Sequence, residues 1–235
     1  MDSEVKAINS EWNKAFSILH LNCRSIKKNF AKLIILLKSL ETDIDILAIS
    51  ETWLCENEHK LFDIPGYTCT FISRSEKGGG GVGLYVKNKH TFKLLGSISK
   101  CSKIYPTNTV DSIFIQIDNG KQKNAVIGCV YNPPGNNANI FNNYLCNILK
   151  DISAKPCYLS GDFNGNLLNH EKHSETSIFL EILYSAGLFP LITHPTRIKD
   201  RSATLIDNIF TNVLNKKITS GLNICDISDH LPILY

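Results

Sequence analysis

The sequence predicts an α/β fold in which two mixed β-sheets pack face to face and carry helices on their outer faces. Three observations support this fold class. Amphipathic helical patterns follow apolar strand-like runs in both halves of the chain. Pairs of strand-like runs joined by short turns are too frequent for a doubly wound parallel sheet. The 235 residues are enough for a single domain, residues 1–235, with a sizeable core.

The first half of the chain predicts a strand–helix–strand unit followed by two hairpins. Residues 16–22 and 43–52 are apolar runs, and the segment between them carries apolar residues at helical spacing. A glycine-rich turn separates YTCTFIS from GVGLYVK, and GKQK separates residues 110–118 from 124–132. The four glycines lead into alternating strand residues and not into a helix, so we interpret them as a hairpin turn and not as a P-loop.

The second half predicts two further helices and several strands. A helical pattern covers residues 140–148, and PCYLSGDFN is a buried strand. Residues 174–188 form another helix, with Ser174 as its N-cap and Gly187 as its stop. Residues 203–212 are a strand pair or a bent strand, and LPILY closes the chain as a strand.

Composition and charge exclude several classes of protein. The formal net charge of +3 permits a nucleic-acid partner without indicating one. The first residues lack the apolar core of a secretory signal, and the longest purely apolar run, LIILL, is too short to span a membrane. The eight cysteines include no CxxC pair, so we interpret them as free thiols in a reducing, intracellular compartment.

Two motifs suggest metal sites but fail on spacing. In SGDFNGN (160–166), a calcium loop starting at Asp162 would need Gly at its sixth position and Glu at its twelfth, where the chain has Leu167 and His173. HEKH (170–173) is not HExxH and lies between a loop and a helix. We therefore expect HEKH to be a solvated surface segment.

Polar side chains end several apolar runs, and together they suit metal-assisted cleavage of a phosphodiester. Strand ends hold such groups in fixed geometry. A carboxylate suits Mg²⁺, an Asp can orient or deprotonate a water, and a His held by a second Asp can address the phosphate. The residues are Asn22, Glu51, Tyr131, Asn132, Asp162, Asn164, Asp207, Asp229 and His230.

Six short motifs occur in the order HLNCRS, SETWL, VYNPP, GDFNGN, TLIDNIF and SDHLPI, and they span residues 20–233. In this order they resemble the endonuclease/exonuclease/phosphatase superfamily. LNCRSI followed by SETWL, GGGGVGLYVK and VYNPPG resembles the endonuclease domain of a non-LTR retrotransposon, a LINE-type element of the CR1/L2/Jockey kind. The fold that this resemblance implies is the four-layer α/β sandwich, which agrees with the strand and helix pattern.

The resemblance implies a role for each matching residue. Asn22 and Glu51 would hold Mg²⁺, for which Mn²⁺ can substitute, with Glu51 as the direct ligand. Asp162 would activate the attacking water, and Asn164 would support the transition state. The other implied catalytic residues are His230 (scissile phosphate), Asp207 (orienting partner of His230), Tyr131 (phosphate or developing charge) and Asp229 (metal or water side).

The resemblance also implies a duplex-DNA substrate. Thr196 and Thr204 match residues that donate to DNA phosphates, and Arg197, Lys199 and Arg201 lie between them. We expect the loop 197–203 to enter a DNA groove and to bias target choice. The implied product is a single-strand nick with a 3′-hydroxyl, made in the nucleus and extended as a primer by the reverse transcriptase domain of the same polyprotein. Neither a membrane nor a small-molecule cofactor is implied.

Three alternatives remain open: an abasic-site repair endonuclease, an inositol or lipid phosphate phosphatase, and a catalytically dead module that binds DNA or protein. Repair-type relatives carry an Asp two residues after the first Asn, where this chain has Arg24. Phosphatase relatives tend to carry GDxNYR- and PxWCDR-type motifs, whereas this chain has GDFNGN and TLIDNIF. The complete set of catalytic residue types argues against a dead module.

Overall fold

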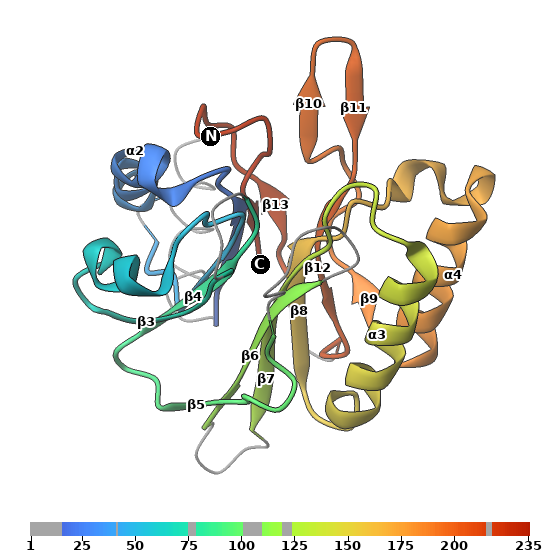
Figure 1. Cartoon of the computed structure of the whole chain (residues 1–235), viewed down its shortest axis with the longest axis horizontal. Helices are drawn as coiled ribbons and strands as arrows, with labels where there is room; N and C mark the ends of the chain where they lie inside the picture. Colours follow the sequence, from blue (N-terminus) through green and yellow to red (C-terminus); the bar gives the residue numbers. More distant parts are fainter. Residues whose placement is uncertain (1–15, 41, 75–78, 101–109, 119–123, 215–217) are drawn as a thin grey trace.

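The chain folds into two six-stranded sheets that face each other, with helices outside both (Figure 1). The computed structural model describes residues 16–40, 42–74, 79–100, 110–118, 124–214 and 218–235. Helix α2 (Ile26–Ser39) and the 3-10 segment η1 (Glu56–Phe62) cover the first sheet. Helices α3 (Ala138–Ile152) and α4 (Ser174–Ser185) cover the second. The predicted four-layer α/β sandwich is therefore confirmed.

The first sheet is built around the predicted strand–helix–strand unit. Strands β1 and β2 are parallel, because α2 carries the chain back to the start of the sheet, and the other pairs are antiparallel. The β3–β4 pairing confirms the first hairpin, although residues 75–78 of its turn lie outside the described residues. The strands of the first sheet, in spatial order, are β13 (Gly221–Leu222), β14 (Ile233–Leu234), β1 (Ile18–Asn22), β2 (Ile46–Ser50), β4 (Val82–Lys87) and β3 (Tyr67–Ile72).

The second sheet repeats this plan around α3. Strands β7 and β8 are parallel, and the remaining pairs are antiparallel. The β6–β7 pairing confirms the second hairpin, whose predicted GKQK turn lies outside the described residues. The strands of the second sheet, in spatial order, are β5 (Phe92–Leu94), β6 (Asp111–Ile117), β7 (Ala125–Tyr131), β8 (Cys157–Asp162), β12 (Asp207–Thr211) and β9 (Phe189–Pro190).

A separate two-stranded hairpin projects beyond both sheets (Figure 1). It consists of β10 (Arg197–Lys199) and β11 (Ser202–Thr204). The sequence predicted a loop for 197–203 and a strand pair or bent strand for 203–212. The structure shows two strands in the second stretch, but they belong to different sheets, because β11 pairs only with β10 whereas β12 joins the second sheet.

The ends of α4 differ slightly from the prediction. The helix begins at Ser174, and His173 occupies the N-cap position without a side-chain cap bond. The predicted N-cap was therefore wrong by one residue. Gly187 follows the end of the helix with a φ of +73°, which matches its predicted role as a stop. Between α3 and α4, a second 3-10 segment, η2 (Leu167–Lys172), carries the end of the glycine-rich GDFNGN loop to the helix.

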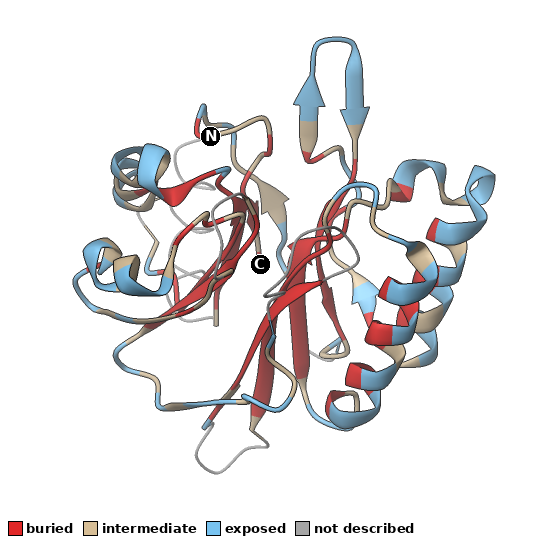
Figure 2. Cartoon of the chain, viewed as in Figure 1, coloured by how far each residue is buried: buried red, intermediate tan, exposed pale blue. Residues whose placement is uncertain are grey.

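The strands of both sheets are largely buried (Figure 2), and strand periodicity decides which of their residues point into the space between the sheets. In β1, Leu19 and Leu21 pack toward α2, whereas Ile18 packs between the sheets. Residues two apart share a face, so Asn22, at the end of β1, points the same way as Ile18. The core is therefore apolar along the strands and becomes polar where the strands end.

Two sequence-based expectations concern membranes and cysteines. Within the described ranges, no helix is long and apolar enough to cross a membrane. Cysteines 23, 55, 69, 129, 146, 157 and 225 are free thiols, as expected, and Cys101 lies outside the described residues.

Candidate active site

The polar strand ends meet at one edge of the sandwich. Because β1 and β2 are parallel, and β7 and β8 are parallel, their carboxyl ends lie at the same edge. Asp162, the last residue of β8, stands opposite Tyr131 of β7 on one side and Asp207 of β12 on the other. Residues that lie far apart in the sequence therefore share one site.

Asn22 links the two sheets at the floor of this site. Its side-chain nitrogen donates to Glu51 Oε1 at 2.8 Å and to Asp162 Oδ2 at 2.7 Å. Its oxygen accepts from the backbone N–H of Arg24 at 3.1 Å, which fixes the orientation of the amide. Asn22 is fully buried. It therefore holds two carboxylates from opposite sheets close together while its nitrogen, not its oxygen, faces them.

Glu51 is held at the mouth by its neighbours and by the glycine-rich segment. Its backbone has a φ of +54°, and its Oε2 accepts from the indole N–H of Trp53 at 3.0 Å. Trp53 N donates to Gly80 O at 2.9 Å, so the glycine segment braces the loop that carries Glu51. A side chain at Gly80 would approach the Arg74 guanidinium to 2.4 Å, which explains why glycine is needed there.

The sequence reasoning missed this role of Trp53 and of the glycines. The glycine motif predicts a hairpin turn, or a loop that a large ligand can approach closely, and the sequence alone assigns no role to Trp53. The available signal was a hydrogen-bond donor side chain two positions after a candidate metal-ligating carboxylate.

His230 and Asp207 form a buried pair. The Nδ1–H of His230 donates to Asp207 Oδ2 at 2.9 Å, so its Nε2 remains free for a ligand. Thr196 donates through its hydroxyl to the same Asp207 oxygen at 2.8 Å, and this hydroxyl accepts from the backbone N–H groups of Asp207 and Ile206. Thr196 has no exposed surface, so in this structure its hydroxyl contacts Asp207 and not the molecular surface.

Asp162 lies beside this pair and shares its electrostatic environment. It accepts from the backbone N–H of Asn164 at 3.1 Å, and its Oδ2 is 3.9 Å from His230 Nδ1. Burial, reinforced by the charge of Asp207, raises the pKa of Asp162 to about 8. Burial alone would lower the pKa of His230, but Asp207 and Asp162 outweigh it and raise that pKa to about 9. The protonation states of Asp162 and His230 are therefore coupled to each other.

Tyr131 and Asn164 complete the wall on the side of the second sheet. Burial, together with the charges of Glu51 and Asp162, raises the pKa of the Tyr131 phenol, so it remains protonated. Asn164 has a φ of +51°, and its side-chain nitrogen donates to the backbone oxygen of Asn132 at 2.7 Å. The loop after β8 is thus tied to the end of β7, which fixes the position of Asn164.

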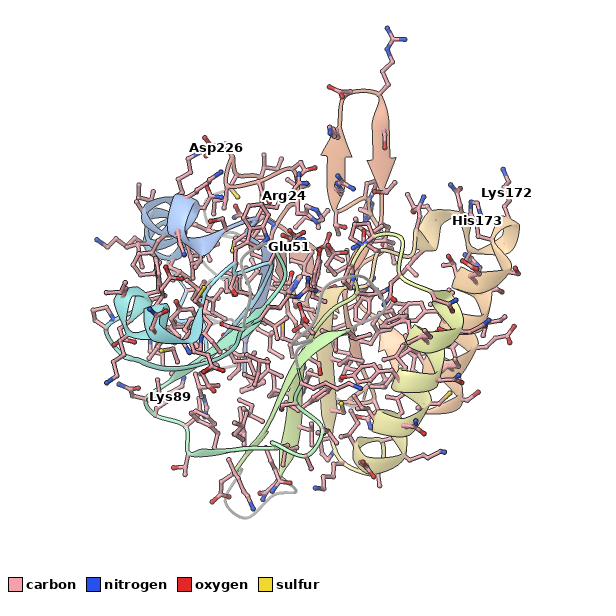
Figure 3. The ribbon with its side chains drawn as sticks, viewed as in Figure 1. Arg24, Glu51, Lys89, Lys172, His173 and Asp226 are labelled. Atoms are coloured by element: carbon pink, nitrogen blue, oxygen red, sulfur yellow. The ribbon has the colours of Figure 1, made fainter. Side chains whose placement is uncertain are left out.

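Asp229 is held between two arginines. Arg24 Nη1 contacts its Oδ1 at 2.7 Å, and Arg197 Nε contacts its Oδ2 at 2.9 Å. Partial burial would raise the pKa of the Asp229 carboxyl, but the bond from Arg197 and the charges of His230 and Arg24 outweigh it and hold that pKa below its usual range. The expected place of Asp229 was the metal or water side, whereas here both of its oxygens face guanidinium groups. Arg24, at the position where repair-type relatives carry Asp, presents a cation to the mouth (Figure 3).

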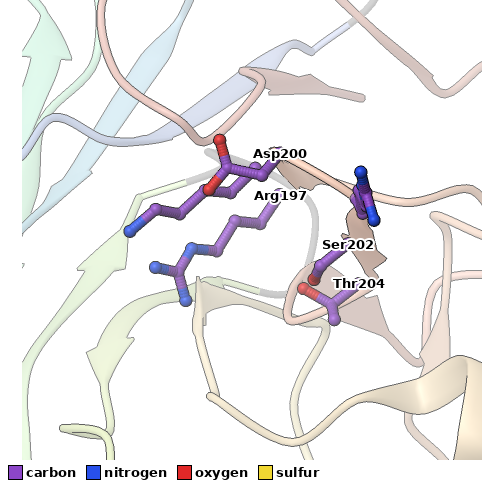
Figure 4. A pocket seen from close by; sticks show the side chains of 6 residues that line it. Arg197, Asp200, Ser202 and Thr204 are labelled. Carbon is purple, nitrogen blue, oxygen red and sulfur yellow. The ribbon is translucent and has the colours of Figure 1, made fainter.

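The predicted DNA-binding residues divide into two groups. Arg197, Lys199, Arg201 and Thr204 line a cavity of about 340 Å³ on the β10–β11 hairpin, together with Asp200 and Ser202 (Figure 4). Lys199 and Arg201 are exposed. Thr196 lies beneath this hairpin, at the buried Asp207.

The histidine motif HEKH lies away from the site. Glu171, Lys172 and His173 are exposed, and Lys172 and His173 are well separated from Glu51 (Figure 3). This confirms the expectation of a solvated surface segment.

The donors at the mouth fit a hard divalent cation. Glu51 is half-buried, and each of its oxygens accepts one hydrogen bond from a neighbouring side chain, at 2.8 Å and 3.0 Å, which leaves lone pairs on both oxygens. Asp162, Asp207 and His230 also place ligand atoms within 4.8 Å of one another. Because Nδ1 of His230 is already bonded to Asp207, this triad suits proton handling better than it suits a metal ion.

Comparisons with known proteins agree with the expected resemblance. Residues 125–234 match the family described as endonuclease-reverse transcriptase. No curated protein sequence matches the chain. The fold is similar to that of the endonuclease domain of TRAS1, a telomere-specific non-LTR retrotransposon, with a TM-score of 0.72 and 15% identity over 94% of this chain and 97% of that one.

Repair enzymes and phosphatases share the same fold. An AP endonuclease from Leishmania major gives a TM-score of 0.72 at 12% identity, over 93% of this chain and 86% of that one. A 3′ phosphatase from Neisseria gives 0.65 at 17% identity, over 94% and 98%. The chain therefore has the fold of the endonuclease/exonuclease/phosphatase superfamily, and the resemblance to the retrotransposon endonucleases within it is confirmed.

Proposed function

We propose that this domain is a divalent-metal-dependent endonuclease that nicks one strand of duplex DNA and leaves a 3′-hydroxyl. The observation that carries the proposal is the joining of a buried His230–Asp207 pair to Asp162, Asn22 and Glu51 across the two sheets. These groups supply the phosphate ligand, the base and the metal-binding carboxylate that phosphodiester cleavage requires.

Each residue acts at a defined atom. His230, protonated because of its carboxylate neighbours, donates from Nε2 to an oxygen of the scissile phosphate. Asp162 accepts a proton from the attacking water, and a base whose pKa lies near the working pH does this efficiently. Glu51, with Asn22 beside it, would hold Mg²⁺ or Mn²⁺, which supplies Lewis-acid polarisation of a phosphoryl oxygen when bound.

Duplex DNA is favoured as the substrate by the projecting β10–β11 hairpin. Lys199 and Arg201 are exposed on it, and Arg197 lies at its base next to Asp229. A basic ribbon beside a catalytic mouth suits a DNA groove and its flanking phosphates. The match of residues 125–234 to endonuclease-reverse transcriptase proteins further supports priming of a reverse transcriptase in the same polyprotein, and hence action in the nucleus.

A plasmid-nicking assay tests the proposal. The purified domain is incubated with supercoiled plasmid and Mg²⁺, beside an EDTA control. We expect conversion to open circles, its loss in His230→Ala, and normal conversion by Lys38→Ala, which removes an exposed side chain from the far end of α2. Nicking that survives in both His230→Ala and Asp162→Ala would overturn the assignment of the site.

If the folded domain does not nick plasmid DNA, the shared fold directs the next substrates. A duplex with an abasic site tests the repair alternative, and inositol phosphates test the phosphatase alternative. Swapping residues 197–203 tests the role of the hairpin: nick-site preference should change while the rate on permissive DNA stays similar. Unchanged preference would refute a role of the hairpin in target choice.

A further inference from the structure

We propose that Arg24 and Arg197, held on either side of Asp229, bind a DNA backbone phosphate within one nucleotide of the scissile bond. This inference rests on the proposed endonuclease function and adds a phosphate-binding subsite to it. The two arginines come from different parts of the fold, since Arg24 follows β1 and Arg197 begins β10.

Asp229 places the two guanidinium groups. Each of its oxygens contacts one arginine, Oδ1 with Arg24 Nη1 at 2.7 Å and Oδ2 with Arg197 Nε at 2.9 Å. The backbone holds all three residues. Arg24 N donates to the buried Asn22 amide, Ile198 N donates to Asp229 O, and Arg197 forms a β-bridge with His230. The guanidinium groups are thus preorganised and do not depend on flexible side chains alone.

Charge and exposure favour an anion. The cluster of Arg24, Arg197 and Asp229 has a net charge of +1, because two guanidinium groups share one carboxylate. The side chains of Arg24 and Arg197 are 43% and 29% exposed, whereas that of Asp229 is 17% exposed. The carboxylate is therefore largely covered while the planar cations, which match phosphate geometry, remain accessible.

The position of the Arg24–Asp229–Arg197 cluster relative to His230 indicates which DNA phosphate the two arginines would bind. The Asp229 oxygen that contacts Arg24 is 4.0 Å from His230 Nε2. Because Nδ1 of His230 is taken by Asp207, Nε2 is the nitrogen that faces this group. A DNA strand whose scissile phosphate meets Nε2 must pass the Arg24–Asp229–Arg197 cluster.

Stability alone gives little reason for this arrangement. Exposed ion pairs contribute little to folding, so a half-exposed Arg24 at the mouth is not explained by its bond to Asp229. Arg24 also has a φ of +42°, a conformation that most side chains avoid. A cation held in this way beside the candidate phosphate ligand is better explained by substrate binding.

Binding to phosphate-modified DNA tests the proposal. The probe is a duplex oligonucleotide with a mapped nick site, in which single phosphates within two nucleotides of the scissile bond are replaced by neutral methylphosphonates. Affinity is measured by fluorescence anisotropy in EDTA, so that no strand is cut. The proteins are the wild type, Arg24→Met, Arg24→Lys and the charge-matched control Lys38→Met, each shown to be folded by its thermal melt.

We expect one methylphosphonate, at or next to the scissile position, to weaken wild-type binding about tenfold, as for loss of a charged hydrogen bond. The same replacement should weaken Arg24→Met binding less, about threefold, because one of the two arginine contacts is already absent and only that of Arg197 remains. Arg24→Lys keeps the charge and loses the planar fork, so its sensitivity should fall between these two. The slope of log affinity against log salt should decrease by about 0.9 in Arg24→Met, and Lys38→Met should keep the wild-type slope.

Equal sensitivity of wild type and Arg24→Met at every position would overturn the inference. That failure differs from failure of the proposed function. If the wild type nicks this duplex and only the difference between the proteins is missing, the endonuclease assignment stands and the arginine subsite does not. If the wild type neither binds nor nicks the duplex, the endonuclease assignment itself fails.

Discussion

Thr196→Val should destabilise the domain although it replaces only one hydroxyl group by a methyl group. The Thr196 hydroxyl is fully buried, donates to Asp207 Oδ2 at 2.8 Å, and accepts from Ile206 N at 3.2 Å and Asp207 N at 3.0 Å. Valine has nearly the same shape but leaves both backbone donors without an acceptor. An orphaned buried donor costs roughly 1–3 kcal/mol, so two cost about 2–6 kcal/mol. That is a large part of a typical stability of about 5–15 kcal/mol.

Urea unfolding followed by circular dichroism measures this cost. The matched control is Thr204→Val, because Thr204 is the half-exposed partner of Arg197 in the hairpin and it contacts Thr196 through its backbone oxygen, which the substitution keeps. We expect Thr204→Val to unfold within about 0.5 kcal/mol of the wild type, as surface substitutions usually do. A Thr196→Val variant as stable as Thr204→Val would refute the assignment of the Thr196 hydroxyl to the support of Asp207.

Three further predictions concern a metal-holding contact, a buried histidine and a glycine. Trp53→Phe removes the N–H that holds Glu51, so Mn²⁺ binding measured by calorimetry should weaken about 10–100-fold; an unchanged Kd would contradict this. Burial lowers the pKa of His20 to about 4, so the free energy of unfolding should fall by up to about 3 kcal/mol as the pH drops from about 6.5 toward 4. Urea titrations at several pH values measure this fall, and His20→Phe should abolish it. Gly80→Ala should lower the melting temperature much more than Gly135→Ala, since both have positive φ but only Gly80 is crowded; equal losses would show that conformation alone matters.

The sign of the His20 effect follows from proton counting. The unfolded chain binds a proton at His20 near pH 6.5, whereas the folded chain resists it until about pH 4. Between these values the unfolded state holds more protons, so acid favours unfolding. His20 Nε2 lies 3.3 Å from Ser50 Oγ, and Nδ1 has no hydrogen-bond partner within the described residues, which agrees with a neutral ring.

Long periodic elements could be predicted from the sequence, and short ones could not. The β1–α2–β2 unit was predicted because its apolar spacing changes from a strand pattern to a helical pattern and back. The β10–β11 hairpin was not predicted, because its two strands have three residues each and carry mostly polar side chains. It is attached to the fold by tertiary bonds, such as Ile198 N to Asp229 O, that no local pattern encodes.

The sequence by itself determined the fold class and the chemical types at the site. The short apolar runs of β1 and β8 indicate buried strands, and the polar residue that ends each run is visible without a structure. The order of the motifs was enough for the family resemblance.

Only the tertiary structure decided which of these groups touch. Asn22 bonds Asp162 across 140 positions, and Arg24 contacts Asp229 across 205. It also placed Thr196 under Asp207 and Trp53 against Glu51. The physical reason is that these contacts form where the ends of two sheets meet, and sequence periodicity specifies which face of a strand is buried but not which strand lies opposite.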